Sequence, residues 1–444
     1  MGLLTFRGGI HPDDGKALSK NREVVPVEAG DTLYFPLSQH IGAPAVPLVQ
    51  KGDRVLRGQM IAEAGGFVSA PVYASVSGTV TGIRPMRMAA GSFCDCIVVE
   101  NDRLMEEVPY EKAEWEELKG EEILNRIRKA GIVGMGGAGF PTHVKLAPKD
   151  PEQIDTILVN GAECEPYLTS DYRRMLEEPD QVTEGLRIVL KLFPKARGCI
   201  CVEDNKRDCA QALKKCLHPE DRIDVKLLKT KYPQGAERML IYAVTGRKIN
   251  SSMLPADAGC IVDNVDTVAA IYRAVALGEP LMGRILTVTG DAVSSPGNFL
   301  APVGMLFSEV LEAAGGLKNQ AEKLIIGGPM MGNAIFDLQI PVTKTSSALL
   351  ALTADEVSAM EPSACINCGR CAEVCPGQVL PARLAVFADH GEEENFLKYH
   401  GMECCECGCC SFVCPAKRQL TQSIKSMRRM ILADRKKAKG GKQG

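Results

Sequence analysis

The chain has 444 residues, 45% of them apolar and 24% charged, and at roughly 150 residues per domain it should hold about three domains. This composition excludes a wholly disordered chain. The net charge of -3 and the aromatic content of 5% argue against a protein that binds nucleic acid through a general positive field or by stacking bases on aromatic side chains.

Cysteine is the unusual residue in this composition. No segment approaches the ~20 consecutive apolar residues that cross a bilayer, and the start of the chain lacks the charged and long apolar regions of a secretory signal. We therefore expect a cytoplasmic protein. Ten of the eighteen cysteines lie between Cys365 and Cys414. In a reducing compartment such clustering indicates metal binding rather than disulfides.

The first region is predicted to be all-β. Residues 26–100 are rich in Val, Gly and Pro, and turn residues recur between short alternating runs. The pattern resembles the lipoyl/biotinyl barrel-sandwich fold, but it lacks the Met-Lys pair whose lysine carries a swinging cofactor. We expect an adaptor or a purely structural β unit within a domain of residues 1–110.

The middle of the chain predicts a Rossmann-like α/β domain over residues 111–283. A helix over 120–130 has Ile123 and Ile127 on one face and acidic residues in its first turn. Strands and helices then alternate, which predicts βαβ units and a mostly parallel sheet. The strands are expected over 154–160, 198–203 and 222–229, and the helices over 181–192 and 206–217.

Three further segments follow. Residues 284–345 predict a smaller α+β unit with a strand from Arg284 and a helix over 305–314. Residues 346–424 contain the clustered cysteines. Residues 425–444 are strongly basic, and we expect a flexible, solvated tail that could also help the chain to dock on acidic lipid or a partner.

The cysteines form a strict internal repeat. Cys365-x-x-Cys368-x-x-Cys371-x-x-x-Cys375-Pro recurs as Cys404-x-x-Cys407-x-x-Cys410-x-x-x-Cys414-Pro. In this spacing three thiolates hold one [4Fe–4S] cubane and the fourth reaches the neighbouring cluster. We therefore predict one cluster on Cys365, Cys368, Cys371 and Cys414, and the other on Cys404, Cys407, Cys410 and Cys375. Zinc is the alternative, although structural zinc prefers separated C-x-x-C pairs. Cys405 and Cys409 leave the second ligand set slightly open.

A glycine-rich loop follows the helix at 120–130. It reads Gly134-Met-Gly136-Gly137-Ala-Gly139-Phe-Pro-Thr-His-Val-Lys145. Glycines allow backbone N–H groups to approach a phosphate or a ring, and Lys145 could neutralise phosphate charge. Tight packing is the alternative. The loop matches neither the G-x-x-x-x-G-K-[ST] pattern nor a Rossmann loop opened by a strand, so ATP and ordinary dinucleotide folds are disfavoured.

Two carboxylates, Glu163 and Glu165, follow the predicted strand 154–160, at the edge where α/β sheets bind their ligands. They could accept hydrogen bonds from ribose or amide groups, or they could be solvated loop charges. The residues alone favour neither interpretation over the other.

Taken together, these segments resemble the RnfC family, a component of the Rnf electron-transport complex, over nearly the whole chain. The opening Phe6-Arg-Gly-Gly-Ile-His-Pro, the run Gly65-Gly-Phe-Val-Ser-Ala-Pro, the glycine loop and the twin cysteine motif carry the resemblance. The middle also resembles the FMN- and NADH-binding subunit of respiratory complex I. That family's loop reads Gly-Arg-Gly-Gly-Ala-Gly-Phe-Pro-Thr, and this chain has Met135 at the arginine.

The resemblance implies a set of ligand-binding residues. Glu163 and Glu165 match an acidic pair at the NADH site, where Ala162 replaces a usual aspartate. Ala236 likewise replaces a glutamate in the segment that begins at Tyr232. The implied FMN-binding residues are Gly134, Gly136, Gly137, Gly139, Lys145, Asn160, Tyr232, Gly235, Glu237, Asn264 and Thr267. The resemblance also makes residues 284–345 a β-grasp (SLBB-like) unit with a structural role, and residues 346–424 a ferredoxin-like helical module with two [4Fe–4S] clusters.

The implied function is that of a peripheral subunit on the cytoplasmic face of the cell membrane. It would exchange electrons between NAD(H) and two [4Fe–4S] clusters through non-covalent FMN. Its partners would be the other Rnf subunits, including membrane subunits and an iron–sulfur, ferredoxin-type subunit, and not nucleic acid. Three alternatives stay open: a cobalamin reductase of the propanediol-utilisation type, a flavin-free ferredoxin-like electron-transfer scaffold, and a zinc-dependent nucleic-acid binder.

Overall fold

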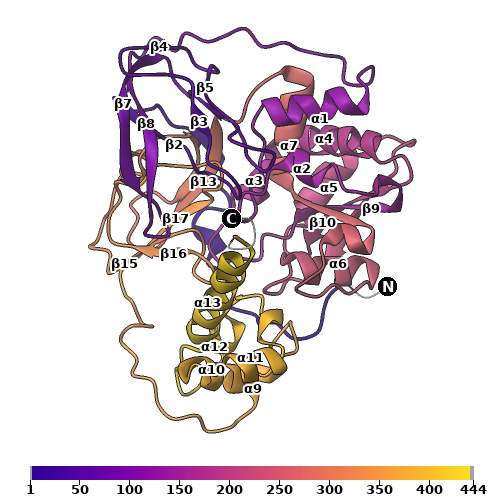
Figure 1. The fold of residues 1–444 in the computed structure, drawn as a ribbon, viewed down its shortest axis with the longest axis vertical. Coiled ribbons are helices and arrows are strands. Elements are labelled where there is room, and N and C mark those ends of the chain that lie inside the picture. The colour runs from indigo at the N-terminus through magenta and orange to yellow at the C-terminus, as the bar shows by residue number, and fades with distance from the viewer. Residues whose placement is uncertain (1–2, 441–444) are drawn as a thin grey trace. The chain divides into compact units, whose positions relative to one another are not determined.

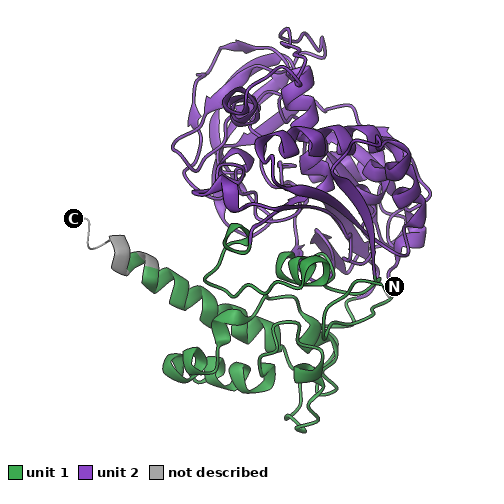
Figure 2. Ribbon diagram, turned by 90° about the vertical axis from the view of Figure 1, so that its right-hand side faces the viewer, with its two compact units in different colours: residues 1–13, 229–258, 355–444 green, residues 14–228, 259–354 purple. Residues whose placement is uncertain are grey.

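A computed structural model of the chain describes residues 3–440. These residues form two compact units, coloured separately in Figure 2. Unit 1 comprises Met1–Asp13, Lys229–Ala258 and Asp355–Gly444, and unit 2 comprises Asp14–Leu228 and Gly259–Ala354. None of the helices within residues 3–440 is long and apolar enough to span a bilayer.

Unit 2 begins with the predicted all-β region, which folds as two small sheets (Figure 1). Leu33 and Phe35 alternate with less buried positions and share a core with Ile97 and Val99 of the paired strand. The antiparallel sheet β2-β8-β7-β4 contains β2 (Thr32–Pro36), β8 (Phe93–Asn101), β7 (Gly78–Arg87) and β4 (Arg54–Val55), and the sheet β3-β5-β6 contains β3 (Val46–Pro47), β5 (Met60–Glu63) and β6 (Val72–Tyr73). The all-β prediction is confirmed.

The α/β region of unit 2 contains the predicted parallel sheet, in the order β11-β10-β9-β12. Residues 157–159 and 199–202 are buried without alternation, as expected when helices cover both faces of a sheet. The strands are β9 (Thr156–Gly161), β10 (Arg197–Glu203), β11 (Ile223–Leu228) and β12 (Cys260–Asn264). The helices are α1 (Gly120–Lys129), α2 (Thr142–Lys145), α3 (Ser170–Glu177), α4 (Pro179–Leu192), α5 (Arg207–Lys215) and α7 (Val265–Tyr272).

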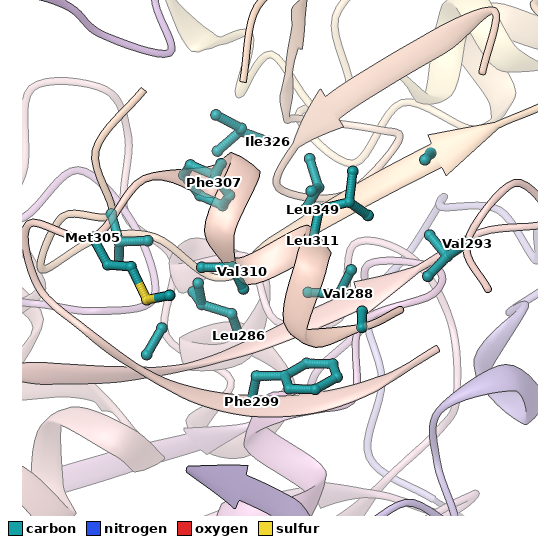
Figure 3. Packing of buried hydrophobic residues seen from close by; sticks show 14 of the residues in the cluster. Leu286, Val288, Val293, Phe299, Met305, Phe307, Val310, Leu311, Ile326 and Leu349 are labelled. Atoms are coloured by element: carbon teal, nitrogen blue, oxygen red, sulfur yellow. The ribbon is translucent and has the colours of Figure 1, made fainter. Parts of the chain in front are cut away.

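The third part of unit 2 is a mixed sheet of six strands in the order β1-β14-β13-β17-β15-β16. Helix α8 (Phe307–Ala313) packs Phe307, Val310 and Leu311 against side chains of this sheet (Figure 3). The strands are β1 (Val24–Pro26), β13 (Gly283–Thr289), β14 (Gly297–Pro302), β15 (Lys323–Ile326), β16 (Asn333–Ile335) and β17 (Ala348–Leu352).

Two boundaries of this third part differ from the prediction. Strand β17 lies beyond residue 345, where we expected the unit to end, yet it pairs with both β13 and β15 in the middle of the sheet. Strand β1 comes from the predicted N-terminal domain and pairs with β14. Both strands are short, and pairing with distant strands, rather than local sequence, decides which sheet they join.

Unit 1 is built around the cysteine segment. Its short helices pack Leu384 and Phe396 against Ile424, Met427 and Ile431 of a longer helix. The helices are α6 (Glu237–Thr245), α9 (Arg370–Glu373), α10 (Pro381–Asp389), α11 (Glu393–Lys398), α12 (Cys409–Phe412) and α13 (Leu420–Gly440). The N-terminal segment joins this unit, since the N–H of Gly9 donates to the carbonyl of Val374 at 2.7 Å and Ile10 bridges to Tyr232.

The expected flexible tail begins with a packed helix instead, because α13 runs from Leu420 to Gly440 and is buried on one face as far as Ile431. Leu420, Ile424, Met427 and Ile431 recur at helical spacing and bury one face of this helix, which gives the basic segment a packed start. Residues 441–444 lie outside the described residues.

Candidate functional site

The glycine loop, residues 134–139, connects α1 to α2 in unit 2. A hydrogen bond closes the loop: the N–H of Gly134 donates to the carbonyl oxygen of Phe140, with an N···O distance of 2.9 Å. Gly139 has a φ of 71°, and a Cβ there would lie 2.8 Å from Cγ2 of Thr345. A Cβ on Gly136 would lie 2.9 Å from Cβ of Asn264, whereas one on Gly137 would meet nothing within 4 Å. The loop is therefore closely packed against Asn264 and Thr345, whereas residues 136–138 are exposed and their backbone N–H groups could meet a ligand.

Lys145 and the start of α7 support this loop. Lys145 Nζ donates to the carbonyl of Val262 and to Oδ1 of Asp263, both at 2.8 Å. Within the described residues the buried Oδ2 of Asp263 has no hydrogen-bond partner. The N–H of Met135 donates to Oγ1 of Thr267 at 3.0 Å. Lys145 thus lies where a phosphate could compete with Asp263 for its ammonium group.

The two asparagines predicted at this site lie on neighbouring strands. Asn160 and Asn264 are paired in the register of β9 and β12. The side-chain oxygen of Asn264 caps α7 by accepting from the N–H of Asp266 at 2.8 Å, and its amide group donates to Asp171 at 2.6 Å. The structure therefore brings Asn160, Asn264, Thr267, Lys145 and the glycine loop together at the carboxyl edge of the parallel sheet, where α/β proteins bind ligands.

The acidic pair is not a solvated loop charge. Glu163 is buried, accepts from the N–H of Asp171 at 2.8 Å, and lies 3.7 Å from Nζ of Lys16. Burial raises the pKa of Glu163 and lowers that of Lys16, so desolvation outweighs their mutual attraction. Lys206 Nζ lies 3.4 Å from the carbonyl of Glu163.

Glu165 has a different environment from Glu163. Its Oε2 accepts from the N–H of Met330 at 3.2 Å, and burial raises its pKa to about 7. Its Oε1 is buried with no hydrogen-bond partner in the described part of the chain. Glu165 therefore retains an oxygen that a donor on a ligand could use. No local pattern in the sequence marks Lys16, Lys206 or Met330 as neighbours of this pair, because all three are distant in the chain.

The predicted residues Tyr232, Gly235 and Glu237 belong to unit 1, not to the unit that contains the glycine loop. The hydroxyl of buried Tyr232 donates to the carbonyl of Cys407 at 2.7 Å. Glu237 begins α6. This hydrogen bond links Tyr232 to the second cysteine run.

Cysteines of the first predicted cluster surround one cavity. A space of about 200 Å³ is lined by Cys365, Cys368, Cys371 and Cys414, which come from segments more than forty residues apart. In the described residues, no three His, Cys, Asp or Glu side chains converge as the ligands of a single metal ion would. Four thiols around a cavity suit a cluster. The ligands of one tetrahedral zinc ion must all lie ~2.3 Å from the same atom, whereas the ligands of a cubane bind different iron atoms and lie farther apart.

The second predicted quartet is more deeply buried. Cys375, Cys404 and Cys410 pack in the core of unit 1, where burial raises the pKa of each thiol. Cys407 is also buried. Cys409 is fully buried, and its thiol faces the carbonyl of Tyr232 at 3.9 Å.

Comparison with known proteins identifies the family. The C subunit of the proton-translocating ferredoxin:NAD(+) oxidoreductase complex of Clostridium ljungdahlii is 44% identical over 443 residues, which cover 98% of this chain and 96% of that protein. The chain belongs to the RnfC family. A second RnfC relative, the C subunit of the Na(+)-translocating ferredoxin:NAD(+) oxidoreductase complex of Acetobacterium woodii, is 43% identical over 98% of each chain.

Family models match four segments of this RnfC-family chain. They are the RnfC barrel sandwich hybrid domain at residues 4–104, the Nuo51 FMN-binding domain at 127–273, the SLBB domain at 285–334 and a 4Fe-4S binding domain at 357–380. These matches confirm the predicted kinds of domain, including the relation to complex I.

Solved structures agree at the level of fold. A chain of the NAD+-reducing [NiFe]-hydrogenase in its H2-reduced state superposes with a TM-score of 0.51 at 18% identity, over 73% of this chain and 63% of that chain. In the air-oxidized state the TM-score is 0.50 at 19% identity, over 65% of this chain and 55% of that chain.

Proposed function

We propose that this chain is the peripheral NAD(H)-reacting subunit of an ion-translocating Rnf complex on the cytoplasmic face of the membrane. It exchanges electrons between NAD(H) and two [4Fe–4S] clusters through non-covalent FMN. Membrane subunits and an iron–sulfur, ferredoxin-type subunit of the complex are its partners. One observation supports this proposal most strongly. The chain belongs to the RnfC family and has both an exposed glycine loop and a cavity lined by four cysteines.

A nicotinamide transfers two electrons as a hydride, whereas each iron–sulfur cluster carries one electron. FMN can accept a hydride and release electrons singly, so it can connect the two. The residues around the loop suit its phosphate: exposed backbone N–H groups over 136–138 and the ammonium group of Lys145 would bind it. Thr267 accepts from the loop, Asn264 caps α7, and Asn160 lies beside Asn264 on the neighbouring strand.

The acidic pair would hold the nicotinamide nucleotide. Glu165 offers a desolvated oxygen to a ribose or amide donor, and Glu163 keeps the turn in place through Asp171 and Lys16. Cys365, Cys368, Cys371 and Cys414 would hold one cluster, and Cys404, Cys407, Cys410 and Cys375 the other.

Anaerobically purified full-length chain tests this function by its iron, sulfide and flavin content. We expect about equal amounts of iron and acid-labile sulfide, enough for two cubanes, together with about one FMN per chain. The same protein should oxidise NADH with an artificial electron acceptor. Iron without flavin, and no NADH oxidation, would instead indicate a ferredoxin-like scaffold, and a colourless zinc protein would indicate the zinc alternative.

A further inference from the structure

The six-stranded sheet and the turn that leads into its strand β17 make three contacts with the region of the glycine loop, all within unit 2. Lys344 Nζ donates to the carbonyl of Gly131, just before the loop, at 2.8 Å. Thr345 packs against Gly139, where a Cβ would lie 2.8 Å from its Cγ2. Arg284 of β13 contacts Sδ of Met135, the one loop residue whose side chain is large and buried. These residues therefore touch the start, the middle and the end of the loop region.

Lys344 is unusual because its charge is not compensated. Its side chain is 1% exposed, and its ammonium group donates to the neutral carbonyls of Gly131 and of Pro71, the latter at 2.6 Å. Within residues 3–440 no carboxylate forms an ion pair with it, and burial lowers its pKa to about 7. His40 is the titratable group that faces it. A buried, unpaired ammonium is unfavourable unless an anion lies near.

Arg284 is the second buried cation that touches the loop, but it has acidic partners. Its side chain is 2% exposed, and it shares the carboxylate of Asp266 with Arg174, whose Nε lies 2.7 Å from Asp266. Arg174 also pairs with Glu178, so these two guanidinium groups face two carboxylates. Asp171 is a further acid nearby, and burial with the adjacent charges of Glu163 and Asp266 raises its pKa to about 7. Arg284 therefore brings no excess of positive charge, unlike Lys344.

We propose that Lys344 is a positioning residue that holds the glycine loop from the turn before β17 and gives it a positive potential selective for a phosphate-bearing flavin. This inference rests on the proposed function, which puts FMN on the loop. An apolar side chain could pack beside the loop equally well, but a buried ammonium group with no carboxylate partner favours an anionic ligand over a neutral one. The six-stranded sheet would then contribute to cofactor selectivity and not only to structure.

Comparison of FMN with riboflavin, which lacks the phosphate, tests this proposal. Full-length chain with its iron–sulfur clusters intact is depleted of flavin, and both ligands are titrated by fluorescence quenching. Lys344→Met should weaken FMN binding about tenfold or more, while riboflavin affinity changes by less than about threefold. Lys318→Met, which removes an exposed charge from the same part of the chain, is the matched control and should leave both affinities unchanged.

The outcomes separate this proposal from the proposed function. Equal losses for FMN and riboflavin would mean that Lys344 only packs beside the loop, and unchanged FMN affinity would remove it from the site. Either result overturns the inference while leaving the function intact. If the wild-type chain binds neither flavin, the proposed function itself fails. Should Lys344→Met lose iron or helical signal, Lys344→Arg serves instead: it should keep the preference for FMN over riboflavin, and loss of that preference counts against the role of charge.

Discussion

The backbone N–H of Met330 donates to the carboxylate of Glu165 at 3.2 Å, although the two residues are 165 positions apart. The approach is close, because a Cβ on Gly328 would lie 2.2 Å from Oε2 of Glu165. A turn of the six-stranded sheet thereby fixes one carboxylate of the predicted nucleotide site. Burial under this turn also raises the pKa of Glu165 to about 7, so the charge on this residue changes with pH near neutrality.

Glu165→Gln should stabilise the flavin-free chain at pH 8 and have little effect at pH 5. The folded-state pKa of Glu165 is raised to about 7 from 4.5, so the folded state binds more protons between these values and stability falls as pH rises through them. Glutamine can still accept from Met330 but carries no charge. We expect a gain on the order of 2 kcal/mol at pH 8, measured by denaturant unfolding. Glu114→Gln, an exposed change in the same unit, should show no such pH-dependent difference; a Glu165→Gln effect equal at both pH values would contradict the buried, ionised carboxylate.

The same variant should impair NADH use more than flavin binding. Glutamine at 165 removes the charge that would accept from ribose or amide donors, and so KM for NADH should rise about tenfold with FMN content unchanged. Steady-state NADH oxidation with an artificial acceptor measures this. Wild-type kinetics in Glu165→Gln would exclude this residue from the nucleotide site.

Lys145→Ala should lower flavin occupancy and leave the iron content intact. Removal of this ammonium group takes a cation from the loop, but it also leaves buried Asp263 without its partner at 2.8 Å, a loss that typically costs about 3–5 kcal/mol of stability. The double variant Lys145→Met with Asp263→Asn separates the two effects, because it removes both charges together. It should regain stability without regaining FMN, as measured by thermal unfolding and flavin content. Lys149→Ala is the exposed control, and full flavin in the double variant would rule out a role for Lys145.

Cys371→Ser should deplete one cluster and spare the other. Cys371 lines the 200 Å³ cavity with the other three cysteines of the first quartet. Iron analysis should show a loss of about half, and electron paramagnetic resonance of the reduced protein should retain the signal of one cluster. Cys216→Ser, a partly buried thiol outside both quartets, should keep full iron. If neither cluster is lost, the assignment of Cys371 as a ligand is wrong. If both clusters are lost equally while the protein stays fully stable, the division of the cysteines into two ligand sets is wrong.

Tyr232→Phe distinguishes between two roles for a residue that the family resemblance connects to FMN. Its hydroxyl donates to the carbonyl of Cys407, so its loss should cost about 1 kcal/mol and alter the reduction potential of the second cluster. Flavin affinity should stay unchanged. Redox titration followed by visible absorption measures the first effect, and flavin titration the second. Tyr242→Phe, on the exposed side of α6 in the same unit, is the control; a fall in flavin affinity with unaltered cluster potentials would favour the FMN role instead.

The sequence by itself determined what depends on local pattern. Continuous apolar runs predicted β9 and β10, glycines and a basic residue marked the loop at 134–145, and the spacing of eight cysteines predicted two cluster quartets, one of which lines a single cavity. Such features follow from neighbours within a few residues, which hydrophobic periodicity and ligand spacing record directly.

Only the tertiary structure decided how distant segments meet. Strand β17 and helix α13 contradicted local expectations because long-range pairing and a buried helical face outweigh propensity. The contacts of Lys344 with Gly131, of Arg284 with Met135 and of Met330 with Glu165 join residues more than a hundred positions apart. A single lysine or arginine in a sequence carries no record of its burial. The charge that surrounds the glycine loop is therefore a property of the folded chain, since desolvation and partner choice arise only when the sheets pack together.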